Sequence, residues 1–236
     1  MMFFKKVLEK VLDILFPKRC IGCLSFVSNN SYFCKDCLSK IQIFDSFFCP
    51  KCKARIPGIK KICHPEEKFI LGSATNYNEL VKQAIWRLKF KFITSGAEPL
   101  ANLLINYFKN LNLQELKIEN FVVIPIPLSK RRLKERGFNQ SELIAKFFAK
   151  HFNLKLETNI LYRIKNTKPQ SEINDFSLRK ENVLNCFAVL DKNLIQNKNI
   201  ILIDDVVTSG ATFKEAVKTL KSAGAKKIIA LAIARA

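Results

Sequence analysis

Glycine and proline are scarce in this 236-residue sequence, with 7 and 8 occurrences, and acidic residues are half as numerous as basic ones. The low glycine and proline content excludes a collagen-like repeat and a low-complexity chain. No run of 18 or more apolar residues occurs, so we expect no transmembrane helix. Charged residues interrupt the apolar residues near the N-terminus and no small-residue cleavage site follows, so we expect no signal peptide and a cytoplasmic protein.

Apolar residues make up 48% of the chain and include 20 phenylalanines, which suffice for a sizeable core. The length allows one domain of ordinary size and a smaller module. Lysine and arginine total 40 against 20 acidic residues, a net charge of +20 that is spread along the chain rather than gathered in a tail. Such a field attracts anions, whether nucleic acid, an acidic membrane surface or phosphorylated metabolites.

The pattern changes twice along the chain and predicts three segments: an amphipathic helix over residues 1–17, a cysteine-rich module over 18–68 and an α/β domain over 69–236. The apolar side of the helix either packs on the rest of the protein, which we favour, or lies on a membrane surface or partner. The second alternative would make the protein peripheral at the inner membrane.

The third segment alternates strands with helices. We predict strands over residues 69–77, 121–126, 200–203 and 228–233, and helices over 79–89, 99–108, 139–152 and 212–223. This order favours an α/β fold, a parallel sheet flanked by helices, whose ligands bind at the carboxyl ends of the strands.

Seven of the eight cysteines fall between residues 20 and 63. In a cytoplasmic protein this clustering favours metal over disulfides. Two Cys-x-x-Cys turns suit one tetrahedral Zn²⁺, and they are formed by Cys20, Cys23, Cys34 and Cys37.

The remaining cysteines of the module, Cys49, Cys52 and Cys63, would need a fourth ligand to hold a second zinc. His64 is the nearest candidate, although adjacent residues chelate one metal less easily than residues at an x-x spacing. Pairings that cross between the two groups are also allowed. The alternative is that the cysteines are reduced and pack as small hydrophobes.

Four further residues admit a structural and a functional interpretation. Phe47 and Phe48 either stack on bases or fill the core of the module, and we favour core filling for at least one. Cys186 has an apolar context and is expected in the core. His151, at a helix end, is expected at the surface rather than as a ligand.

A phosphate-binding pattern follows the predicted strand at 200–203. Backbone N–H groups and the hydroxyls of Thr208, Ser209 and Thr212 can face an anion, Gly210 permits its close approach, and the dipole of the following helix adds favourable charge.

Two carboxylates, Asp204 and Asp205, stand between that strand and that loop. They would repel a phosphate unless another group needs them. They can accept hydrogen bonds from the hydroxyls of a ribose 5-phosphate, or hold Mg²⁺ through water. The alternative is a solvated acidic turn at the start of a helix.

A second basic segment follows the predicted strand at 121–126. Five cations occur within seven residues, and we expect a loop here that binds an anion; the cations are Lys130, Arg131, Arg132, Lys134 and Arg136. We favour ligand or loop roles for Arg131 and Arg136, and a solvated helical face for Lys134 and Glu135.

The acidic pair with its loop resembles the signature of the type I phosphoribosyltransferases, which bind 5-phosphoribosyl 1-diphosphate (PRPP) with Mg²⁺. The resemblance implies that the acids hold the ribose and the loop holds the 5′-phosphate, and the residues concerned are Asp204, Asp205, Thr208, Ser209, Gly210, Ala211 and Thr212. It also implies a diphosphate-binding role for Ser129, Lys130, Arg131 and Arg132.

The sequence also resembles, over residues 18–236, one subset of that fold, the ComF family (ComFC or GntX-like). In this family a zinc ribbon precedes the phosphoribosyltransferase domain. The resemblance rests on Arg-Gly-Phe-Asn-Gln at 136–140, Pro-Ile-Pro-Leu at 125–128, Leu-Lys-Phe at 88–90 and residues 163–182, which occupy the place of the mobile loop that closes over PRPP. The seventh cysteine, which has no eighth partner at x-x spacing, departs from the fuller double-ribbon pattern.

The resemblance implies a protein of natural transformation that handles incoming single-stranded DNA beside a competence helicase or the uptake machinery. Its nucleic-acid contacts would include Arg136, Lys134 and Lys89. Two alternatives stay open: an active phosphoribosyltransferase in nucleotide or cofactor metabolism with an unidentified acceptor, and a zinc protein that only binds partners.

Overall fold

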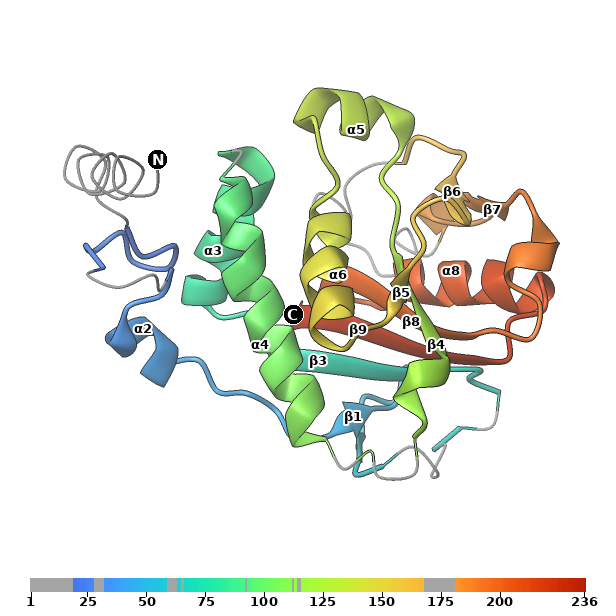
Figure 1. The fold of residues 1–236 in the computed structure, drawn as a ribbon, viewed down its shortest axis with the longest axis horizontal. Helices are drawn as coiled ribbons and strands as arrows, with labels where there is room; N and C mark the ends of the chain where they lie inside the picture. The colour runs from blue at the N-terminus through green and yellow to red at the C-terminus, as the bar shows by residue number, and fades with distance from the viewer. Residues whose placement is uncertain are drawn as a thin grey trace, which may run out of the picture.

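The computed structural model describes residues 19–27, 32–58, 63–64, 66–91, 93–111, 113, 116–167 and 181–236. The helix expected over residues 1–17 and most of the expected mobile loop lie outside these ranges. Within them, a central sheet is covered by helices, and a cysteine-rich module packs at one side of it (Figure 1). None of the helices found in these ranges is long and apolar enough to cross a membrane.

The described residues form helices and strands with the following bounds. The helices are α2 (Lys35–Ser39), α3 (Glu79–Phe90), α4 (Ala97–Asn110), α5 (Lys130–Arg136), α6 (Gln140–His151) and α8 (Ala211–Ser222), with short 3-10 turns at Thr94–Gly96, Ile118–Asn120 and Lys192–Leu194. The strands are β1 (Phe47–Phe48), β2 (Arg55–Ile56), β3 (Ile70–Asn76), β4 (Phe121–Pro125), β5 (Lys155–Leu156), β6 (Leu161–Arg163), β7 (Phe187–Val189), β8 (Asn199–Val207) and β9 (Lys227–Arg235).

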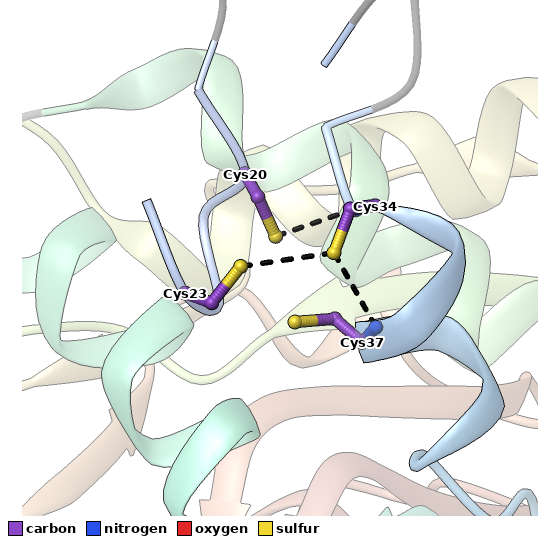
Figure 2. A group of neighbouring side chains, drawn as sticks. All are labelled: Cys20, Cys23, Cys34 and Cys37. Atoms are coloured by element: carbon purple, nitrogen blue, oxygen red, sulfur yellow. Dashed lines mark hydrogen bonds between the residues drawn. The ribbon is translucent and has the colours of Figure 1, made fainter. Parts of the chain in front are cut away.

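The N-terminal cysteine module is held against the rest of the chain. Its first four cysteines converge beside α3 (Figure 2). The guanidinium of Arg87, on α3, donates hydrogen bonds to the backbone carbonyls of Ile21 and Gly22. Further along, the hydroxyl of Tyr107 donates to the carbonyl of Ser46 at 2.8 Å. Buried polar contacts of this kind fix the module to α3 and α4.

The main sheet has the strand order β2-β1-β3-β9-β8-β4-β5. The five strands from β3 to β5 are parallel, and the β1–β2 hairpin adds antiparallel to β3. The carboxyl ends of the central strands therefore meet at one edge, where α/β proteins bind ligands. A separate two-stranded sheet, β6–β7, lies between α6 and β8 in chain order.

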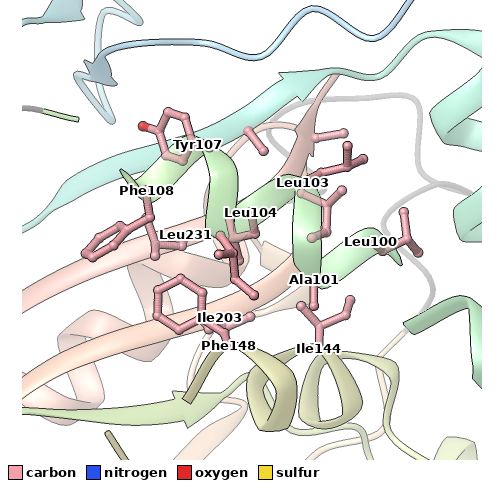
Figure 3. Close-up of a cluster of buried hydrophobic side chains, with 14 of the residues drawn as sticks. Leu100, Ala101, Leu103, Leu104, Tyr107, Phe108, Ile144, Phe148, Ile203 and Leu231 are labelled. Carbon is pink, nitrogen blue, oxygen red and sulfur yellow. The ribbon is translucent and has the colours of Figure 1, made fainter. Parts of the chain in front are cut away.

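Side chains of β8 alternate between two cores. Ile201 and Ile203 pack with α4 and α6 on one face, whereas Ile200 and Leu202 pack with α8 on the other. Figure 3 shows α4 and α6 facing each other across the first core, with Ile203 and Leu231 rising from the sheet beneath them. Because both faces are covered, β8 and β9 contain continuous apolar runs at residues 200–203 and 228–234.

The structure confirms the four predicted strands and four predicted helices of residues 69–236, each with ends within a few residues of those expected. The largest difference concerns β8, which we predicted to end at residue 203. It continues to Val207 because residues 204–207 keep pairing with β9. The α/β fold class is therefore confirmed.

The loop conformation that we expected over residues 129–136 is wrong, since Lys130–Arg136 form the helix α5, whereas the anion-binding role of these residues stays a prediction. Ser129 caps the helix by accepting a hydrogen bond from the N–H of Arg132, and Arg131 pairs with Glu135 one turn later at 2.7 Å. Gly137 ends the helix in the left-handed region at φ 75°. A serine cap, an i,i+4 ion pair and a terminal glycine outweigh the repulsion among the cations.

Candidate functional site

A cavity of about 610 Å³ opens at the carboxyl end of β8. Residues 204–212 form its floor, α3 contributes one wall, and α5 with the start of α6 contributes another. All seven residues of the predicted ribose and phosphate pattern line it: Asp204, Asp205, Thr208, Ser209, Gly210, Ala211 and Thr212. The parallel sheet thus brings the acidic pair and the hydroxyl loop together at one opening.

Each acid of the pair has its own partner. The carboxylate of Asp205 is buried and forms an ion pair with the ammonium of Lys89, on α3, at 2.7 Å. The carboxylate of Asp204 accepts hydrogen bonds from the hydroxyl of Ser141 at 2.7 Å and from the N–H of Asp205 at 2.9 Å. These partners fix both carboxylates toward the cavity.

Burial, together with the negative charge of Asp205, raises the pKa of Asp204 from 3.8 to about 7, although the hydrogen bond from Ser141 opposes the shift. The folded protein therefore retains this proton between about pH 4 and pH 7, whereas the unfolded chain releases it. Over that interval the folded state binds more protons, so this group makes stability fall as the pH rises.

Asp204→Asn is therefore expected to stabilise the protein at pH 8, by on the order of 2 kcal/mol, because the amide avoids the cost of a buried charge. Well below pH 3.8, where Asp204 is protonated in both states, the two proteins should unfold alike. Urea unfolding of both proteins across this pH range measures the difference. A difference that stays constant with pH would contradict the raised pKa.

The loop after β8 is shaped for an anion. Gly210 adopts φ 78° immediately before α8, a conformation that strains other residues, and the space beside its Cα is open. The hydroxyl of Ser209 accepts a hydrogen bond from the N–H of Ala211. The first N–H groups of α8 and the loop hydroxyls thus surround an open position at a helix N-terminus.

A lysine of the cysteine module braces this loop. Lys53 donates a hydrogen bond to the carbonyl of Thr208 at 2.9 Å. Burial, and the neighbouring charges of Arg235 and Lys214, lower the pKa of Lys53. Lys53 therefore brings positive charge to the loop, whereas the neighbouring Lys214 is paired with Glu67 at 2.6 Å.

The basic residues of α5 divide into two groups. Arg132 and Arg136 line the cavity, whereas Lys130, Arg131 and Lys134 are not among the described residues that line it. All three of these are exposed, and Arg131 is paired with Glu135.

Two further predicted residues have structural partners. Ser129 is buried as the cap of α5, and its backbone forms an isolated parallel β-bridge with Arg163 of β6. Lys89 lines the cavity, but its ammonium faces Asp205, so the structure gives it a charge partner inside the protein rather than a free surface.

The first cysteine cluster fits zinc. The sulfur atoms of Cys20, Cys23, Cys34 and Cys37 all lie within 4.8 Å of one another, and the Cys23 and Cys34 sulfurs are 3.7 Å apart (Figure 2). Tetrahedral zinc with Zn–S bonds of about 2.3 Å requires sulfurs separated by about 3.8 Å. The four thiols can therefore converge on one ion with shifts of about 1 Å or less.

The second cluster contains His64 as its fourth member. Cys52 and Cys63 bring their sulfurs to 3.5 Å, and the Cys49 sulfur lies 3.3 Å from Nδ1 of His64. All four ligand atoms lie within 4.8 Å. The adjacent residues Cys63 and His64 thus reach the same position, and the two groups do not cross.

The remaining expectations have structural outcomes. Phe47 and Phe48 are both buried, so both fill the core of the module and neither can stack on a base. Cys186 is buried and His151 is exposed, as expected. Sequence analysis missed Ser141, although it directly follows the Arg-Gly-Phe-Asn-Gln motif, and it also missed the contact of Lys53 with the loop.

Comparisons with known proteins agree with this geometry. Residues 11–65 match the family described as "Double zinc ribbon domain", and residues 139–236 match the family described as "Phosphoribosyl transferase domain". Among solved structures, the glutamine phosphoribosylpyrophosphate (PRPP) amidotransferase from Bacillus subtilis matches with a TM-score of 0.37 and 19% identity, covering 58% of this chain and 26% of that one.

Curated relatives match over most of their length. The chain is 29% identical to "Competence protein ComFC" of Bacillus subtilis, covering 81% of this chain and 78% of the relative. It is 29% identical to "Competence protein F" of Haemophilus influenzae, covering 92% and 90%. It is 26% identical to "DNA utilization protein YhgH" of Escherichia coli K12, covering 83% and 86%.

The fold, the acidic pair with its loop and the two cysteine clusters define a zinc-ribbon protein with a phosphoribosyltransferase domain. Over most of its length the chain is similar to the competence proteins ComFC and F and to the DNA utilization protein YhgH.

Proposed function

We propose that this chain is a competence protein that binds PRPP in the cavity and handles incoming single-stranded DNA during natural transformation. The proposal rests on one observation: Asp204, Asp205 and the 208–212 loop line the same cavity. The names of the relatives, which refer to competence and DNA utilization, support the DNA part.

The residues at the opening would divide the ligand among them. Asp204 and Asp205 accept hydrogen bonds from the ribose hydroxyls, and residues 208–212 receive the 5′-phosphate at the start of α8. Arg132 faces the same cavity and supplies charge for the diphosphate. Mg²⁺, which binds phosphate oxygens and water, would accompany the diphosphate.

The ion pair between Lys89 and Asp205 has a consequence for this assignment. The ribose must share the Asp205 carboxylate with an ammonium that already contacts it at 2.7 Å. The lysine also neutralises one of two adjacent negative charges, which lowers their repulsion toward an incoming phosphate. Lys89 is therefore assigned to the PRPP site rather than to contact with DNA.

The DNA part of the proposal rests on charge. A net charge of +20 exceeds what one PRPP requires, and the exposed Lys130 and Lys134 extend the basic surface of α5 beyond the cavity. We assign this excess to the phosphates of a single strand. The setting that we propose is the cytoplasm, beside a competence helicase or the uptake machinery.

Titrating one zinc-loaded sample with single-stranded DNA and with PRPP tests the proposal. Binding of a labelled oligothymidine should weaken log-linearly as salt rises, because each phosphate contact releases counterions, and a duplex of equal length should bind more weakly. PRPP binding is measured by calorimetry. DNA binding insensitive to salt would contradict phosphate contacts, and release of diphosphate from PRPP with a metabolite acceptor would instead identify a transferase.

A further inference from the structure

Two aromatic side chains are exposed at the mouth of the cavity. Trp86 and Phe90 lie one turn apart on α3, are 43% and 55% exposed, and both line the cavity. Their ring centroids are 6.2 Å apart with the planes tilted by 40°. The helix already buries an apolar stripe of Val81, Ala84, Ile85 and Leu88, so its packing does not require these two rings.

Cations accompany both rings. The ammonium of Lys91 lies 5.4 Å from the centroid of the Trp86 ring, and the guanidinium of Arg136 lies 5.3 Å from that of Phe90. Arg136 comes from α5, so two separate elements direct positive charge to the same pair of rings.

The acidic groups at this wall are already balanced. Glu135 lines the cavity but pairs with Arg131 at 2.7 Å, and Asp205 pairs with Lys89 at 2.7 Å. The charge available beside the rings is therefore positive, which matches a polyanion that carries planar groups.

We propose that Trp86 and Phe90 form a stacking platform for a base of single-stranded DNA, and that Lys91 and Arg136 contact the phosphates beside that base. The inference deepens the proposed function and rests on it. Aromatic faces stack on any base and nearby cations follow the backbone, which is how proteins bind single strands without sequence preference. The platform places the strand at the opening of the cavity that receives PRPP.

Competing aromatic sites are few in the part of the chain that the structure describes. Phe47 and Phe48 are buried, and the exposed phenylalanine and tryptophan side chains are Trp86, Phe90 and Phe26. Phe26, at 64% exposure, lies in the first ribbon and also has a cation over its ring, the guanidinium of Arg19 at 4.4 Å. It is a matched control, because it has the same chemistry outside the cavity.

Fluorescence reports the contact directly, because Trp86 is the single tryptophan of the chain. The zinc-loaded full-length protein is titrated with an oligothymidine of about 12 nucleotides, within the range of site sizes for single-strand binding, and with an abasic strand of equal length. The oligothymidine should quench Trp86 emission and the abasic strand should not. Phe90→Leu should weaken oligothymidine binding about tenfold, while Phe26→Leu should leave it unchanged.

The possible outcomes distinguish failure of the stacking platform from failure of the proposed DNA-binding function. Tight oligothymidine binding without quenching, and with normal affinity in Phe90→Leu, would reject the platform but keep the DNA-binding function. Loss of affinity in Phe26→Leu alone would move the base contact to the ribbon and also reject it. Quenching by free thymine but not by the strand would indicate a small acceptor instead. Absence of any binding to single strands would overturn the proposed function itself.

Discussion

Replacing both Asp204 and Asp205 by asparagine is expected to lower the affinity for PRPP by at least about a hundredfold, because the carboxylates accept hydrogen bonds from the ribose hydroxyls and hydrogen bonds to charged groups contribute roughly 1.5–3 kcal/mol apiece. The affinity is measured by calorimetry in the presence of Mg²⁺. The amides keep the size of the side chains and the oxygen that accepts from Ser141, so the fold should survive.

Asp191→Asn provides the control for that experiment. Asp191 is exposed, caps a 3-10 turn by accepting from the N–H of Asn193, and is not among the described residues that line the cavity. Asparagine is an equally good cap, so this variant removes one negative charge without disturbing the structure. Unchanged PRPP affinity in the double variant would remove the ribose assignment, and equal losses in both proteins would point to net charge alone.

Cys20→Ser is expected to reduce the zinc content from two ions per chain to one, since Cys20 belongs to one of the two clusters and is fully buried. Structural zinc contributes on the order of 10 kcal/mol to the folding of small ribbons, so the first ribbon should unfold rather than loosen. Metal analysis of the purified protein and its thermal unfolding measure both effects. Cys186→Ser removes another buried thiol, outside either cluster, and should keep two ions.

His64→Ala applies the same measurement to the second cluster. Loss of the fourth ligand should lower the zinc content to one ion, while His151→Ala, which removes the other histidine of the chain, should keep two. Two ions in His64→Ala would mean that a water or another residue completes the second site. Two ions in Cys20→Ser would contradict the pairing of the first.

The sheet could be predicted from sequence because its strands are strong local signals. The runs at 121–125 and 200–203 are continuous and β-branched, and each is followed by residues with helical spacing. Strands β1, β2 and β5 have two residues each, too few for any periodicity. Helix α5 was not predicted because we interpreted its five cations as an anion-binding loop. Its cap Ser129 and its terminal Gly137 are typical of the start and the end of a helix.

The candidate site was predictable where its residues are neighbours in sequence. The acids at 204 and 205 and the loop at 208–212 form one local pattern, and a parallel sheet fixes its place. The partners of that pattern come from elsewhere: Lys89, Ser141 and Lys53 are brought by α3, α6 and the cysteine module. Long-range packing places them, and no local spacing encodes it. His64 was a candidate because it directly follows Cys63, whereas its convergence with Cys49 is visible only in the structure.

The position of the cysteine module beside β3 has a consequence for the integrity of the whole molecule. Strand β3 pairs with β9 on one side, and on the other side only residues 44–48 cover it among the described residues, through β1 and the hydrogen bond from the N–H of Phe44 to the carbonyl of Ala74 at 2.9 Å. Six of its seven residues are buried. Without the module, β3 would be an unpaired edge strand of seven residues, the kind of surface on which other chains assemble. The boundary near residue 68 therefore separates two patterns of sequence but not two independently soluble pieces, and cutting the chain there would yield a domain prone to aggregation.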